Sequence, residues 1–136
     1  MNLTRLIYAA PFDPLAQRNL RLLITNRHRR LAPLNVTGLL LVSGSRQIEV
    51  LEGNRADLSA LLADAYGQDS QAGITLITCV EVRERLFSSW RAVLREAGDP
   101  KVAEVALQFL GAADWTDGTI CPDRLTDIMH ELSLTL

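Results

Sequence analysis

An apolar segment followed by a glycine turn does most to constrain the fold of this chain. Residues 36–43 form a nearly continuous apolar run, and the dipeptide Gly44-Ser45 then leads into a second predicted strand over residues 47–52. Two strands joined by so short a glycine-containing loop are typical of a β-hairpin. The sequence therefore predicts a buried strand that turns back into a second, antiparallel strand.

Apolar periodicity and capping residues place the remaining elements around this hairpin. Proline is well tolerated at a first helical position, so a helix is expected to begin at Asp13-Pro14 and to run to about Arg30. Asn54 is expected to cap a second helix, which ends at Gly67. The other predicted elements are a first strand over residues 3–10, strands over 74–82 and 90–94, and two helices around 102–110 and 125–132.

The order of these elements predicts an α+β fold. A βαββαββ sequence with right-handed crossovers gives a ferredoxin-like sheet that carries two helices on one face. The other face is then left for a C-terminal helical pair. A chain of 136 residues has the size of a single domain. We expect residues 1–97 to form its body and residues 98–136 to form a helical extension of the same domain.

Composition and charge argue against several classes of partner. The formal net charge of −2 predicts no strong attraction to nucleic acid or to an anionic membrane. The one basic cluster, residues 27–30, lacks interleaved aromatic residues and suits a helix C-terminus, where cations offset the helix dipole. The longest apolar runs are too short to cross a bilayer. We therefore expect a cytoplasmic protein that binds neither nucleic acid nor membrane.

Nothing in the sequence predicts an enzyme or a metal site. The two cysteines, Cys79 and Cys121, cannot form a disulfide framework or a four-cysteine zinc site, which suits a reducing compartment. Cys79 lies within an apolar strand and is expected to be buried. Asp127, His130 and Ser133 are all expected on one helix, an arrangement that cannot surround a pocket as a catalytic triad does.

Four short segments, taken in order, resemble the BLUF family of blue-light sensors that use FAD. They are Leu6-Ile7-Tyr8, residues 36–40 with Thr37-Gly38-Leu39-Leu40, residues 50–53 with Leu51-Glu52-Gly53, and residues 87–90 ending in Trp90. The resemblance implies that Tyr8 matches the tyrosine that gives an electron and a proton to the flavin after light. It also implies that Trp90 stands where many members carry a tryptophan. If no flavin binds, we expect Tyr8 to be an ordinary aromatic residue of a strand and Trp90 to anchor the edge of the core.

The same resemblance shows departures at the positions that would hold the flavin. The asparagine pair of the family aligns with Arg30 and Leu31, and its switching glutamine aligns with Glu49. Arginine only donates hydrogen bonds, leucine offers none, and an ionised glutamate only accepts. A protonated Glu49 could donate, but only if desolvation raised its pKa. The cofactor positions implied by the resemblance are therefore Tyr8, Arg30, Leu31 and Glu49, and the photoactive ones are Tyr8, Glu49 and Trp90.

Three hypotheses follow. The first is a sensory or regulatory domain that signals through protein contacts, with FAD binding and photoswitching weakened or lost. The second is a flavin-free, dimeric protein-interaction module. The third is a ferredoxin-like small-ligand binder or enzyme that uses Arg30 and Glu49. If flavin is lost, we expect the oppositely charged side chains of Arg30 and Glu49 to approach each other, directly or through water, and to fill part of the flavin's place.

Overall fold

The computed structural model describes residues 3–12, 19–43, 46–66, 74–94 and 122–134. Its elements, in chain order, are β1 (Leu3–Pro11), α1 (Leu20–Leu31), the 3-10 turn η2 (Ala32–Leu34), β2 (Thr37–Ser43), β3 (Arg46–Asn54), α2 (Arg55–Tyr66), β4 (Thr75–Val82), β5 (Trp90–Leu94) and α4 (Pro122–Leu134). This order confirms the predicted α+β fold. The expected helix start at residues 13–14 and the expected helix over 102–110 lie outside the described residues.

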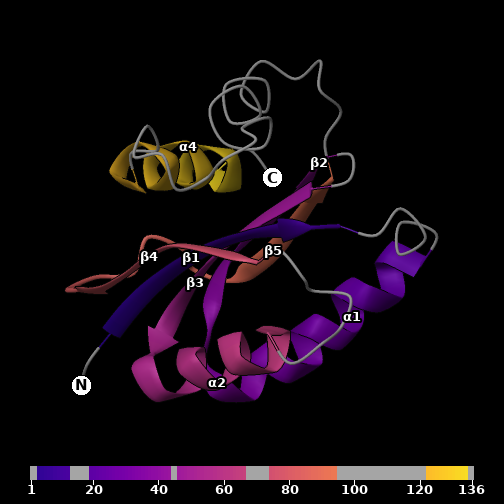
Figure 1. Ribbon diagram of the computed structural model, residues 1–136, viewed down its shortest axis with the longest axis horizontal. Helices are drawn as coiled ribbons and strands as arrows, with labels where there is room; N and C mark the ends of the chain where they lie inside the picture. The colour runs from indigo at the N-terminus through magenta and orange to yellow at the C-terminus, as the bar shows by residue number, and fades with distance from the viewer. Residues whose placement is uncertain (1–2, 13–18, 44–45, 67–73, 95–121, 135–136) are drawn as a thin grey trace.

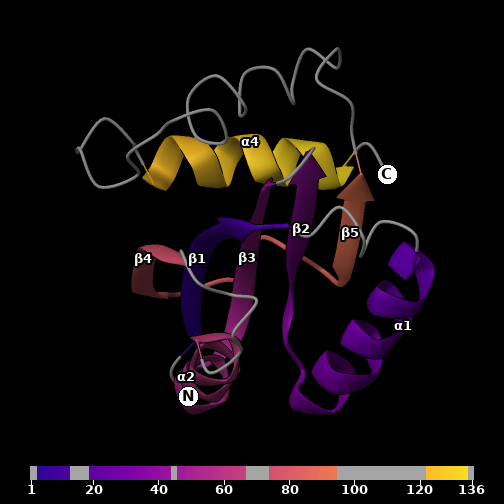
Figure 2. The same cartoon turned by 45° about the vertical axis from the view of Figure 1, so that its right-hand side comes forward.

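The five strands form one sheet in the order β4-β1-β3-β2-β5, as Figure 2 shows. Strands β1 and β3, β1 and β4, and β2 and β3 pair antiparallel, so the predicted hairpin is present. Strand β5 instead lies parallel to β2 at the far edge. The central strand is therefore β3, which has neighbours on both sides and a helix layer on each face.

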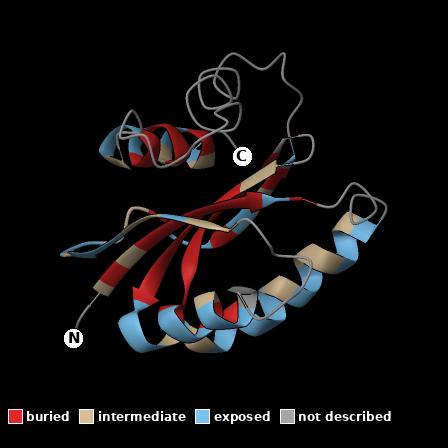
Figure 3. Cartoon of the chain, in the orientation of Figure 1, coloured by how far each residue is buried: buried red, intermediate tan, exposed pale blue. Residues whose placement is uncertain are grey.

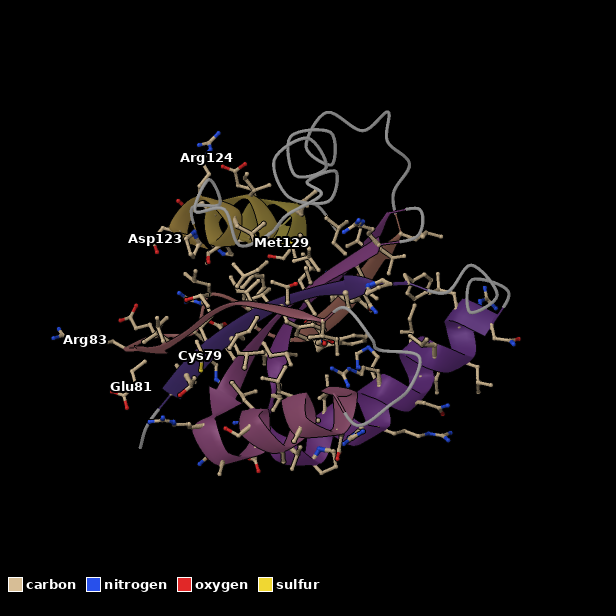
Figure 4. The ribbon with its side chains drawn as sticks, in the orientation of Figure 1. Cys79, Glu81, Arg83, Asp123, Arg124 and Met129 are labelled. Carbon is tan, nitrogen blue, oxygen red and sulfur yellow. The ribbon has the colours of Figure 1, made fainter. Side chains whose placement is uncertain are left out.

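The sheet separates two apolar layers. Helices α1 and α2 cover one face and α4 covers the other (Figure 1). The side chains of α4 that meet the sheet recur at helical spacing; they are Leu125, Ile128, Met129 and Leu132, all buried. Met129 lies on the side of α4 that faces the strands (Figure 4). The predicted placement of helices on opposite faces is thus confirmed for these three.

The sequence signal for the start of α2 is also confirmed. The amide of Ala56 donates a hydrogen bond to Asn54 Oδ1 at 2.8 Å, which satisfies one of the backbone N–H groups that a helix start leaves without a partner. Because α2 begins directly after β3, this cap fixes the point at which the central strand leaves the sheet.

The prediction of a buried Cys79 is wrong. Cys79 is exposed on β4, an outer strand of the sheet, and exposed residues recur along this strand in Figure 3. Figure 4 labels Cys79 on β4. An outer strand has a sheet neighbour on one side only, so even an apolar run such as residues 74–82 keeps part of its surface in water. None of the described helices is both long enough and apolar enough to span a membrane.

Candidate functional site

Glu49 is the centre of a polar cluster buried beneath α1. It faces Tyr8 directly across the β1–β3 ladder, and this pairing puts both side chains on the sheet face that α1 and α2 cover. Glu49 is 0% exposed. A carboxylate buried in this way is stable only when it is paired and hydrogen-bonded, so Glu49 must have partners within the protein. The Tyr8 hydroxyl donates to Glu49 Oε1 at 2.6 Å.

Two further donors reach the same carboxylate from other elements. Trp90, the first residue of β5, donates from its indole Nε1 to Glu49 Oε2 at 2.8 Å. Arg27 of α1 donates from Nη2 to Oε1 at 2.5 Å and from Nε to Oε2 at 3.4 Å. An ionised carboxylate has about four acceptor positions. Tyr8, Trp90 and Arg27 together supply four hydrogen bonds, so the acceptor capacity of Glu49 is filled by the protein.

The charges in this cluster bias the protonation of its members. Burial raises the pKa of the Tyr8 phenol well above its usual 10.0, and the negative charge of Glu49 raises it further. Burial is the largest single influence on the pKa of the Arg27 guanidinium and lowers it, but the charge of Glu49, the interaction with Tyr8 and the hydrogen bond to Glu49 together raise that pKa above its ordinary value. At neutral pH the cluster therefore holds a neutral tyrosine and a charged arginine around the carboxylate.

The prediction that Arg30 forms an ion pair with Glu49 is wrong, because the cation that pairs with Glu49 is Arg27. Arg30 forms an ion pair with Asp64 of α2, and both side chains are about half exposed. Glu49 pairs with Arg27, which precedes Arg30 by three residues. Three residues advance an α-helix by about 300°, so Arg30 lies about 60° around α1 from Arg27, on the flank where it meets Asp64 instead of Glu49.

Of the candidate residues identified from sequence, the structure joins Tyr8, Glu49 and Trp90 by hydrogen bonds. Arg30 pairs with Asp64 instead, and Leu31 shares only the apolar cluster with Tyr8 and Trp90. Leu31 is 1% exposed and packs within the apolar layer under α1. Its side chain has no polar group to offer a ligand. The hydrogen-bonded cluster around Glu49 therefore contains the strand residues of the prediction and neither of the two helix residues.

Arg27 is the site residue that sequence reasoning missed, although the sequence holds a signal for it. Leu20, Ile24 and Leu31 lie at helical spacing on the side of α1 that packs toward the sheet, and Arg27 falls on the same stripe. A charged residue on an apolar helix face needs a buried partner of opposite charge. Glu49, in the middle of the apolar strand β3, is that partner.

An open cavity of about 460 Å³ lies along α1 next to this cluster. The described residues that line it come from α1 and the residue just before it, and they recur every three or four positions; they are Asn19, Leu22, Leu23, Asn26, Arg27 and Arg30. Arg27 therefore belongs both to the buried cluster and to the wall of the cavity. The Arg30–Asp64 pair, which joins α1 to α2, shows that this flank of α1 is turned toward α2.

A second buried carboxylate, Glu52, lies on the opposite face of β3. Glu52 is 0% exposed and its Oε2 accepts from Arg5 Nε at 3.0 Å and from Arg5 Nη2 at 2.8 Å. Its Oε1 accepts from the backbone amides of Leu86 and Phe87, each at 2.9 Å. Glu52 therefore fixes the connection between β4 and β5, and this connection leads directly to Trp90.

Comparisons with known proteins agree on one family. The family model described as "BLUF: Sensors of blue-light using FAD" matches residues 3–93. A solved structure of BlsA in its photo-activated state superposes with a TM-score of 0.73 at 16% identity, covering 97% of this chain and 95% of that one. The dark-state structure of the BLUF protein BlrB superposes with a TM-score of 0.68 at 19% identity, covering 99% and 98%.

A longer relative carries a flavin in its solved structure. Klebsiella pneumoniae BlrP1 with FMN and cyclic diGMP is 25% identical and superposes with a TM-score of 0.63, covering 96% of this chain and 34% of that one. No curated protein sequence matches this chain.

Proposed function

Because this chain belongs to the BLUF family, described as sensors of blue light using FAD, we propose that it is a sensory or regulatory domain that acts through protein contacts and has weakened or lost its flavin. The observation that supports this proposal best is the bonding of Glu49. Its carboxylate is fully buried and takes four hydrogen bonds from Tyr8, Arg27 and Trp90.

The residues present do not fit the polar edge of a flavin ring. Flavin N5 and O4 are hydrogen-bond acceptors and need a donor from the protein. An ionised Glu49 has no proton to donate, and the single O–H of Tyr8 is already given to Glu49. If the Tyr8 hydroxyl donated its hydrogen bond to a flavin instead, the buried carboxylate of Glu49 would lose one of its donors, at a cost of about 1–3 kcal/mol.

Arg30 and Leu31, which align with the asparagine pair of the family, offer the flavin ring no replacement hydrogen bonds. Leu31 is apolar and buried, and the Arg30 guanidinium is engaged by Asp64 on α2. Each buried hydrogen bond that a ligand loses weakens binding by about 0.5–1.5 kcal/mol, so several losses lower the affinity by one or more decades. Weak or absent flavin binding is the consequence that we propose.

The relatives suggest how such a domain acts. The matching region covers 40% of a bacterial light-regulated adenylyl cyclase and 34% of a BlrP1 chain, so domains of this fold occur within longer chains. In this protein we propose that the signal passes by contact with a protein partner or with a second copy of the chain.

The flavin content of the purified protein tests the proposal. We expect far less than one flavin per chain after heat release, and no reversible red shift of a flavin spectrum under blue light. BlrB, purified in the same way, serves as the positive control. Recovery of about one FAD per chain together with the red shift would overturn the proposal.

A further inference from the structure

We infer that the cavity along α1 binds a small amphipathic carboxylate, with the acid group on Arg27 and the apolar part on leucine side chains. The inference rests on the proposed function, because a chain without stoichiometric flavin leaves this flank of α1 accessible to another ligand. A volume of about 460 Å³ lies within the usual range of small-molecule sites.

The geometry of Arg27 supplies the anion-binding group. A guanidinium has five N–H donors on two usable edges. Glu49 takes the side edge, formed by Nε and Nη2. The end edge consists of one Nη1 proton and the second Nη2 proton, and among the described residues none accepts a hydrogen bond from it. The Arg27 side chain is 22% exposed and lines the cavity. A planar carboxylate matches such an edge with two parallel hydrogen bonds.

The surroundings of Arg27 favour an anion with an apolar tail. Helix α1 carries four arginines and no acidic residue, while the facing carboxylates Glu49 and Asp64 offset two of those charges. Leu22, which lines the cavity together with Leu23, is 60% exposed. Covering an exposed leucine with a hydrocarbon chain is favourable, because it removes apolar surface from water.

Binding at this cavity has a direct route to the buried cluster. The ligand and Glu49 share one guanidinium, and Glu49 also accepts the indole N–H of Trp90. A carboxylate on the end edge of Arg27 polarises the bonds on its side edge. The Trp90 indole proton therefore reports a ligand that it does not touch.

The test titrates octanoate into the full chain, with octanamide as a neutral probe of the same length. Calorimetry is expected to give one octanoate site and an affinity for octanamide at least about tenfold lower. The ¹⁵N-labelled indole signal of Trp90, assigned with Trp115→Phe, is expected to shift with octanoate. Asn26→Asp adds a negative charge to the cavity wall and is expected to weaken octanoate binding about tenfold.

Thr25→Asp is the matched control. It adds the same charge one residue away on the same helix, at an exposed position that does not line the cavity, and is expected to change the affinity less than about threefold. Equal affinities for octanoate and octanamide, equal effects of the two variants, or no octanoate binding by a flavin-free chain would each overturn the inference. A one-to-one complex with FMN that octanoate does not displace would instead overturn the proposed function.

Discussion

Tyr8 and Glu49 are cross-strand partners, and the tyrosine hydroxyl donates a hydrogen bond to the carboxylate over 2.6 Å. A carboxylate presents two equivalent oxygens, whereas a glutamine amide presents one donor and one acceptor. Turning a glutamine by half a rotation exchanges its donor and acceptor, but the same turn leaves Glu49 with the same bonding. The direction of the Tyr8 hydrogen bond is therefore fixed by the residue type at position 49.

The ion pair between Arg27 and Glu49 is expected to contribute strongly to stability. Arg27→Met leaves a buried carboxylate without its cation, which costs about 3–5 kcal/mol in the free energy of unfolding. Adding Glu49→Gln is expected to recover much of this loss. A double-mutant cycle by urea unfolding measures the coupling directly.

The ion pair between Arg30 and Asp64 provides the control for this cycle. Both side chains are about half exposed, so the cycle of Arg30→Met with Asp64→Asn is expected to give a coupling below about 1 kcal/mol. A larger coupling for this exposed pair than for Arg27 and Glu49 would contradict the assignment of the buried cation.

Stability is expected to fall at high pH because of Tyr8. Burial and the charge of Glu49 raise the pKa of Tyr8, so the folded chain keeps this proton at a pH where the unfolded chain has lost it. The contribution is complete below a pH of about 10. Above that pH it declines by up to about 1.4 kcal/mol per unit until the raised pKa is passed. Urea unfolding between pH 8 and 11 should show this decline in the wild type and not in Tyr8→Phe; parallel curves would show that Tyr8 is not responsible.

Flavin uptake is expected to return only when Arg27 is changed together with the aligned positions. Glu49→Gln with Arg30→Asn and Leu31→Asn supplies the missing amides, but it leaves the Arg27 guanidinium beside position 49. Adding Arg27→Ala removes a partly buried cation that has lost its carboxylate, together with the side-chain bulk beside position 49. Quenching of FMN fluorescence is expected to show tighter binding for the fourfold variant than for the threefold variant by about tenfold or more. Equal affinities would mean that Arg27 plays no part in excluding the ring.

Glu52 is expected to hold the connection between β4 and β5. Glu52→Gln removes the charge that pairs with Arg5 and leaves one oxygen for all the donors, so a loss of about 1.5–3 kcal/mol is expected. Amide hydrogen exchange should become faster at Leu86 and Phe87, whose N–H groups donate to Glu52. Glu81→Gln, at an exposed position on β4, is the control and should change stability by less than about 0.5 kcal/mol.

Local signals in the sequence predict most of the strands and helices of this fold. They fail for properties, such as the exposure of a side chain, that depend on which elements pack beside each other. The predicted strand over residues 90–94 coincides with β5, because β-branched and aromatic residues and the polar stretch before it mark a strand without help from the rest of the chain. The exposure of Cys79 could not be predicted in this way. It depends on β4 lying at an edge, which only the order of the strands decides.

The candidate site shows the same division. Tyr8 and Glu49 were found because the family resemblance follows the chain, strand by strand. Arg27 lies outside the four short segments that carry the resemblance, and its role depends on how α1 is rotated over β3. The apolar stripe of α1 indicates which side of the helix faces the sheet. A search for charged residues on apolar helix faces would therefore have selected Arg27 ahead of Arg30.

The three-residue interval between Glu49 and Glu52 has a consequence for strand alignment. Successive side chains of a strand point to opposite faces, so this odd interval sends one carboxylate to each side of β3. Sliding β3 by one position against β1 would turn both carboxylates to the wrong face and leave two arginines, Arg5 and Arg27, without their acids. Sliding it by two would keep the faces but carry Glu49 away from Tyr8. Only one register of β3 against β1 therefore gives both Glu49 and Glu52 their partners, so the two buried acids specify the alignment of the central strand.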